Sequence, residues 1–124
     1  MKDFIKISEA EWKIMKVLWR VSPLTSAEII EALKKDTSWS PKTIHTLISR
    51  LVKKEAIGVK KGSRFKLFSP LVTEEECKSL EAKSFLEKVY SGSVKMFIAN
   101  FIKDEKLSQE EIEELERILE EKKR

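Results

Sequence analysis

Residues 39–48, with the sequence Trp-Ser-Pro-Lys-Thr-Ile-His-Thr-Leu-Ile, constrain the fold of this chain more than any other stretch. Ser40 is placed to cap a helix, and Pro41 follows at the first helical position, where its missing N–H costs nothing. Apolar side chains then recur at the spacing of one helix face, at Ile44, Leu47, Ile48 and Leu51. The pattern predicts an amphipathic helix that runs from Ser40 to about Lys54.

The opposite face of this predicted helix is short, polar and cationic, with no acid before Glu55. Its central residues are Lys42, Thr46, Ser49 and Lys53, and its flanking residues are Thr43, His45 and Arg50. Such a face suits the major groove of DNA, but on a single helix it more often indicates only a solvated surface. The neighbouring segments therefore decide between the two interpretations.

Two helices are predicted before this one and a hairpin after it. Capping boxes at residues 8–11 and 25–28 open the two helices, because Ser or Thr is followed three residues later by Glu. Residues 57–61 and 64–69 alternate apolar and polar side chains as strands do, and Gly62-Ser63 joins them as a tight turn. The hairpin should pack on the helices through Phe65 and Leu67, or else through Phe68.

Three helices followed by a basic hairpin form the layout of a winged helix-turn-helix. In that layout the third helix enters the major groove, and the hairpin lies along the backbone. We expect the side chains of Lys42, Thr43 and Thr46 to contact the edges of the bases. We expect phosphate contacts from Arg50, Lys53, Lys54, Lys60, Lys61 and Arg64. The three tryptophans, Trp12, Trp19 and Trp39, are interpreted as core residues.

The C-terminal part of the chain predicts three more helices. Capping boxes open two of them at residues 73–76 and 108–111, and Ser91-Gly92 separates the first from a very apolar helix over residues 94–102. We therefore predict a DNA-binding domain over residues 1–72 and a helical domain over residues 73–124. The fold class is mainly α with a small β-hairpin wing.

The helices of residues 73–124 are too short to bury much surface alone, yet their apolar faces are rich in Leu, Ile, Val and Phe. A second copy of the chain would cover them and give an intertwined dimer, whereas folding back on residues 1–72 is the alternative. The predicted dimerisation residues are Leu80, Phe85, Leu86, Val89, Phe97, Ile98, Phe101, Ile112, Leu115, Ile118 and Leu119. A two-fold dimer would place two recognition helices on an inverted repeat.

Charge divides the chain in the same way as the predicted domains. Residues 1–72 hold 15 Lys and Arg against 7 Asp and Glu, a net +8, and residues 73–124 hold 10 against 14, a net −4. A basic half suits nucleic acid, and an acidic half suits a different task.

Several classes of function are disfavoured by composition. The single cysteine, Cys77, cannot form an internal disulfide, and neighbouring acids should raise its pKa, so we interpret it as structural. No nucleophile–base pair, glycine-rich phosphate loop or metal-ligand spacing occurs, which predicts no enzyme, no cofactor and no metal site. No apolar run approaches a membrane helix, and residues 1–4 do not resemble a signal peptide, so we expect a cytoplasmic protein without membrane insertion.

Several motifs in order along the chain resemble the penicillinase repressor family (BlaI/MecI type). They are residues 8–12, 39–44, 46–48, 50–51, 53–54, 69–72, 85–92 and 107–115. The resemblance implies a cytoplasmic, dimeric transcriptional repressor with a winged-helix domain and a three-helix dimerisation domain. It implies operators with TACA/TGTA-type inverted half-sites, in front of β-lactamase or penicillin-binding-protein genes and of the repressor's own operon.

The resemblance also implies how such a repressor is switched off. A membrane sensor-transducer, a zinc metalloprotease acylated by β-lactam, triggers repressor cleavage at an Asn-Phe bond, and Asn100-Phe101 stands in the corresponding place. His45 departs from the Arg or Lys that relatives often carry, so either the half-site differs or His45 contacts phosphate or nothing. The alternatives are a regulator of the same fold with another signal and a winged-helix module that recognises protein or RNA.

Overall fold

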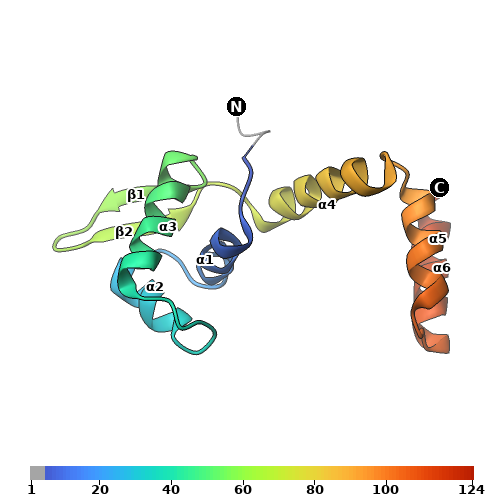
Figure 1. Ribbon diagram of the computed structural model, residues 1–124, viewed down its shortest axis with the longest axis horizontal. Coiled ribbons are helices and arrows are strands. Elements are labelled where there is room, and N and C mark those ends of the chain that lie inside the picture. Colours follow the sequence, from blue (N-terminus) through green and yellow to red (C-terminus); the bar gives the residue numbers. More distant parts are fainter. Residues whose placement is uncertain (1–4) are drawn as a thin grey trace. The chain divides into compact units, whose positions relative to one another are not determined.

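The computed structural model describes residues 5–124 (Figure 1). Residues 1–4, to which the signal-peptide prediction refers, lie outside the described residues. The chain divides into two compact units, Met1–Leu80 and Glu81–Arg124. This division falls within helix α4 (Glu74–Tyr90), eight residues after the predicted domain boundary at 72/73.

Three helices and a hairpin form the first unit: α1 (Glu9–Arg20), α2 (Ser26–Leu33), α3 (Pro41–Lys53), β1 (Ile57–Lys61) and β2 (Lys66–Pro70). The predicted capping boxes of α1 and α2 are present, with Ser8 and Thr25 as caps. Ser40 caps α3 and Pro41 begins it, as predicted. Local sequence therefore fixes where each helix starts, because each cap satisfies backbone N–H groups that the helix leaves unpaired.

The core of this unit lies between the three helices and the hairpin. Each helix and the first strand contribute side chains that are fully or almost fully buried: Ile14, Met15, Leu18, Ile29, Ile44, Leu51 and Ile57. The predicted inner face of α3 is confirmed, since Leu47 and Ile48 are buried as well. The tryptophans lie partly buried against this core, and the Trp19 indole N–H donates to the Val72 carbonyl oxygen at 2.9 Å. Burial of this kind contributes about 1.5–3 kcal/mol for each large side chain.

The hairpin differs from its prediction at the turn. The strands pair antiparallel from Ile57–Pro70 to Lys61–Lys66, so residues 62–65 form a four-residue loop, and the predicted two-residue turn is wrong. The Gly62 N–H donates to the Phe65 carbonyl oxygen at 2.8 Å. A Cβ at Gly62 would lie 2.6 Å from that oxygen, so the loop requires glycine at this point.

The hairpin packs on the helices through Phe68, which confirms one of the two predicted arrangements. Phe68 exchanges both backbone hydrogen bonds with Leu24, at 3.0 and 2.7 Å, and this bridge holds its side chain in the core. Leu67 is only half-buried, and Phe65 is 64% exposed, so packing through Phe65 and Leu67 is wrong. In Figure 1 the loop end of the hairpin projects away from α1, α2 and α3.

The second unit contains the end of α4, α5 (Val94–Asp104) and α6 (Gln109–Lys122). The predicted capping boxes of α4 and α6 are present, through Thr73 with Glu76 and through Ser108 with Glu111. The predicted break between α4 and α5 is confirmed, because Ser91 and Gly92 both adopt positive φ there.

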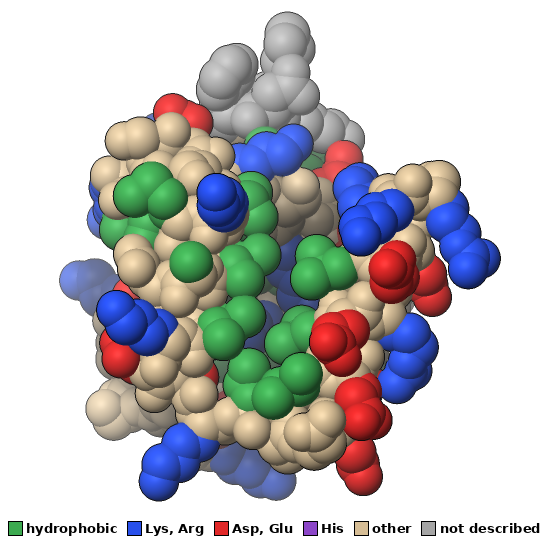
Figure 2. Space-filling view, turned by 90° about the vertical axis from the view of Figure 1, so that its right-hand side faces the viewer, with side chains coloured by type: hydrophobic (Ala, Val, Ile, Leu, Met, Phe, Trp, Pro, Cys, Tyr) green, Lys and Arg blue, Asp and Glu red, His purple; other side chains and the backbone are tan. Residues whose placement is uncertain are grey.

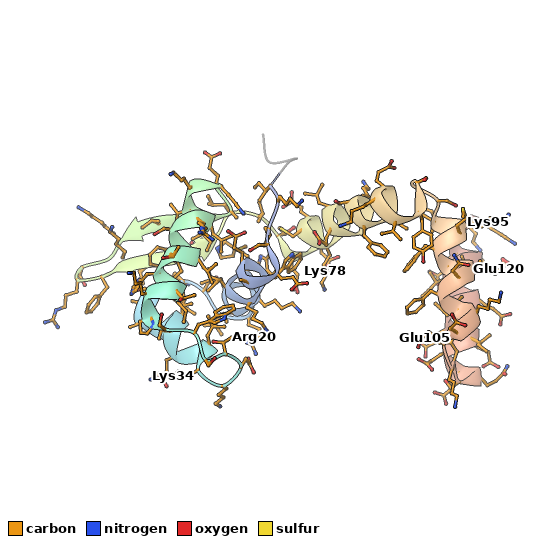
Figure 3. All side chains as sticks on the ribbon, in the orientation of Figure 1. Arg20, Lys34, Lys78, Lys95, Glu105 and Glu120 are labelled. Carbon is orange, nitrogen blue, oxygen red and sulfur yellow. The ribbon has the colours of Figure 1, made fainter. Side chains whose placement is uncertain are left out.

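A short loop joins α5 to α6, and the two helices overlap in the view of Figures 1 and 3. None of the residues 81–124 is buried. Figure 2 shows a band of hydrophobic side chains across the face that α5 and α6 form, with acidic side chains along one side. Aromatic rings cluster where α4 meets α5, and successive centroids are 5.4–6.0 Å apart in the set Phe85, Tyr90, Phe97 and Phe101. The unit thus keeps much of its apolar surface uncovered.

Candidate nucleic-acid interface

Contacts at both ends of the helix α3 and along its inner face fix it in place. At its start the Ser40 hydroxyl oxygen accepts the Thr43 N–H at 3.2 Å. At its end the chain turns through Glu55, which adopts a left-handed φ of 64°, and the Ala56 N–H donates to the Leu51 carbonyl oxygen at 2.9 Å. This is the Schellman pattern of a terminated helix. With its inner face in the core, α3 can present only its outer face to a partner.

The outer face of α3 carries the predicted recognition residues. All are exposed: Lys42, Thr43, His45, Thr46, Ser49, Arg50 and Lys53. The structure brings six of them together around one shallow depression, lined by Lys42, His45, Thr46, Ser49, Arg50 and Lys53. None of these six residues is acidic, so the surface is cationic and attracts phosphate.

Two threonines on this face already make local hydrogen bonds. The Thr46 hydroxyl donates to the Lys42 carbonyl oxygen at 3.0 Å, one helical turn earlier. It therefore offers a partner its methyl group and an accepting lone pair, but not a donor. The Thr43 hydroxyl lies 3.1 Å from that of Ser40, beside the helix cap.

Lys54 is oriented differently from the other predicted phosphate contacts. Its ammonium donates to Glu11 Oε1 at 2.5 Å and to the Lys6 carbonyl oxygen at 2.7 Å. Glu11 is 1% exposed, and its carboxylate also accepts the Ser8 N–H at 2.8 Å. The pair joins the end of α3 to the start of α1, so Lys54 has a structural partner that sequence reasoning did not predict.

The pKa of the Glu11 carboxyl follows from these contacts. Burial alone would raise this pKa, but the hydrogen bond from Lys54, the Ser8 N–H and the Lys54 charge together hold it below its ordinary value of 4.5. Glu11 is thus ionised at neutral pH, and the Lys54–Glu11 ion pair is formed inside the first unit.

A groove of about 810 Å³ lies between α3, the start of α2 and the hairpin. Four predicted contact residues line it: His45, Ser49, Lys53 and Arg64. Its apolar floor includes Ile48, Val52, Val59 and Phe68. Lys60 and Lys61 are exposed on β1.

Sequence reasoning missed five further residues that line this groove. They are Thr25, Ser26 and Ala27 at the start of α2, and Phe65 and Lys66 at the loop end of the hairpin. The cap at Thr25 marked only a helix start, and the alternation of residues 64–69 gave no indication of which side chains remain exposed. A basic pair flanking an aromatic residue, Arg64-Phe65-Lys66, was the available signal.

Other kinds of site receive no support from the described residues. Within residues 5–124, no group of His, Cys, Asp and Glu is arranged to hold a metal ion, and no helix is both long and apolar enough to cross a membrane. Burial, and then the charge of Glu76, raises the pKa of the Cys77 thiol. The predicted direction of this shift is confirmed, and Cys77 is a buried residue of the first core.

The family model described as "Penicillinase repressor" matches residues 7–121 of the chain. The chain is 41% identical over 123 residues to the penicillinase repressor of Bacillus licheniformis, which covers 99% of this chain and 96% of that protein. It is 43% identical over 117 residues to the methicillin resistance regulatory protein MecI of Staphylococcus aureus strain N315, covering 94% of this chain and 95% of that protein.

A solved structure of a related protein resembles the first unit. It is the solution structure of monomeric B. licheniformis BlaI in complex with the blaP half-operator. The match has a TM-score of 0.52 at 41% identity, and it covers 57% of this chain and 87% of that one.

Proposed function

Because this chain belongs to the penicillinase repressor family, we propose that it acts as a homodimer on an operator with inverted TACA/TGTA-type half-sites. The family makes it a DNA-binding transcriptional repressor, and the predicted winged helix-turn-helix is its fold. We further propose that it represses β-lactamase or penicillin-binding-protein genes in the cytoplasm and is inactivated by proteolysis.

One observation carries the DNA-binding part of this proposal. Six exposed side chains from α3, none of them acidic, line a single shallow depression. In this mode α3 lies in the major groove, where Lys42, Thr43 and Thr46 meet base edges. Arg50, Lys53 and the hairpin cations then contact phosphates on either side, and they fix the orientation of α3.

The dimer is supported by the uncovered apolar surface of the second unit. Side chains of α5 and α6 that would belong to a core are widely exposed, including Phe101 at 54%, Ile118 at 62% and Leu119 at 59%. Soluble monomers rarely expose such a contiguous surface. A second copy would bury it and would hold two recognition helices for one inverted repeat.

Cleavage at Asn100-Phe101 would undo this arrangement. The bond lies within α5, so it must leave the helix before a protease can engage it, and the Phe101 ring contacts Phe97 with centroids 5.7 Å apart. Scission there separates α6 from the rest of the chain. The dimer would lose the apolar contacts that α6 contributes, and the protein would lose the avidity of two half-sites.

Fluorescence anisotropy with a labelled inverted-repeat duplex and a scrambled duplex, across a salt series, tests the operator. We expect the inverted repeat to bind about a thousandfold tighter. Equal and steeply salt-dependent binding to both would reject the proposed half-site. Binding to neither would favour a protein-recognition module of the same fold.

Sedimentation of a shortened chain that ends at Asn100 tests the proposed inactivation by cleavage. We expect the shortened protein to sediment as a monomer at concentrations where the full chain is a dimer. If the shortened protein remains a dimer, the proposed inactivation fails.

A further inference from the structure

The phenylalanine at the loop end of the hairpin keeps its side chain outside the core. Phe65 is 64% exposed, while Phe68 three residues later supplies the contact with the core. The side chain is not at the end of a loose loop, because its carbonyl oxygen accepts the Gly62 N–H at 2.8 Å. An aromatic ring is therefore presented to solvent from a closed four-residue loop.

The surroundings of Phe65 indicate what kind of partner it meets. Phe65 lines the same groove as His45, Ser49 and Lys53 of α3, which places it beside the face of α3 that we propose to contact DNA. Its chain neighbours are Arg64 and Lys66, and they line the groove too. Among residues 5–124, no Asp or Glu lines this groove. Cations beside an apolar surface match a sugar–phosphate strand, which alternates anionic phosphates with apolar deoxyribose faces.

Building on the proposed function, we infer that Phe65 packs against the deoxyribose of the DNA strand that passes between α3 and the hairpin. Arg64 and Lys66 hold the phosphates on either side of that sugar. The contact is apolar and independent of base sequence. It therefore adds affinity on operator and non-operator DNA alike, and it releases no counterions.

The chemistry of this contact gives it a distinctive dependence on salt. A lost phosphate contact flattens the log–log dependence of affinity on salt by about 0.9, whereas a lost apolar contact lowers affinity at every salt concentration without a change in slope. Phe65 is 64% exposed beforehand, so covering its ring removes about two-thirds of a large apolar side chain from water. The expected loss is thus about 5- to 30-fold for each hairpin engaged.

The test compares Phe65→Ala, Phe65→Leu and Arg64→Ala in the full chain, by anisotropy on duplexes that carry one half-site or a scrambled sequence. We expect Phe65→Ala to weaken both duplexes about equally with an unchanged salt slope, Phe65→Leu to retain much of the affinity, and Arg64→Ala to flatten the slope. Thermal unfolding should be unchanged in all three variants, since both side chains are exposed.

Three outcomes overturn the inference. Affinity that is unchanged in Phe65→Ala would remove the contact, and a slope that changes as much as in Arg64→Ala would make its effect electrostatic. A loss confined to the half-site duplex would make Phe65 a reader of sequence instead. If the wild-type chain binds neither duplex, the proposed function itself fails, which is distinguishable from a failure of the Phe65 contact alone.

Discussion

Replacing Lys54 by methionine should destabilise the first unit, although Lys54 lies at the edge of a surface that we assign to DNA. The substitution keeps an unbranched side chain of similar length and removes the ammonium that pairs with Glu11. The carboxylate of Glu11 then stays in place with its side chain only 2% exposed, and it retains the Ser8 N–H as a partner at 2.8 Å. A buried charge left without its counter-ion is costly.

The size of the effect lies between two limits. Breaking a fully buried pair costs about 3–5 kcal/mol, and an exposed pair contributes about 0–1 kcal/mol. Here one side chain is buried and the other is 36% exposed. With the Ser8 hydrogen bond retained, we expect a loss of about 2 kcal/mol. For a domain of this size such a loss lowers Tm by about 8–16 °C.

Tryptophan fluorescence during thermal and urea unfolding measures this loss selectively. All three tryptophans, Trp12, Trp19 and Trp39, lie in the first unit, so the signal reports that unit alone. Lys53→Met is the matched control, because Lys53 is the preceding residue on the exposed face and should change stability by less than about 0.5 kcal/mol. Equal stability of the two variants would refute the structural role of the Lys54–Glu11 pair.

Further predictions concern pH, the end of α3, base reading and the dimer. The pKa of Glu11 is lower in the folded state than its ordinary 4.5, so stability should fall as the pH drops below about 4.5; Glu11→Gln should flatten this decline in acid unfolding curves. Glu55→Gly should raise the free energy of unfolding by about 0.5–1 kcal/mol, and with it the urea midpoint, because glycine adopts φ of 64° without strain; a lower midpoint would contradict this. Thr46→Ala should reduce discrimination between operator and scrambled DNA by about 1–3 kcal/mol, whereas Thr46→Val should retain it by keeping the methyl group; equal losses on both duplexes would exclude base reading. Ile118→Asp should shift sedimentation towards the monomer, and an unchanged dimer would place the interface elsewhere.

Local chemistry made the helices of this chain predictable. Ser8, Thr25, Ser40 and Ser108 cap helices where the sequence indicated, because a capping contact involves only residues within one turn. The inner face of α3 was equally predictable, since the helical period alone determines which of its residues share a face.

Features that depend on contacts between distant segments were not predictable. The bridge between Leu24 and Phe68 selects Phe68 for the core, and the alternation of the strand cannot distinguish it from Phe65. Lys54 was predicted to contact phosphate, but its ammonium pairs with Glu11, which lies 43 residues earlier in the chain. The four-residue hairpin loop was missed for a local reason, because Gly62-Ser63 also fits a two-residue turn, whereas Gly62 in fact closely approaches the Phe65 carbonyl oxygen.

The relative orientation of two half-sites tests most directly whether the protein binds its operator as a two-fold dimer. The measurement is the affinity of the full chain for an inverted repeat and for a duplex of the same length and composition in which one half-site is reversed to form a direct repeat. A two-fold dimer with one α3 in each half-site should bind the inverted repeat far more tightly, and the direct repeat about as weakly as a single half-site. Equal affinity for both duplexes would contradict a symmetric dimeric repressor.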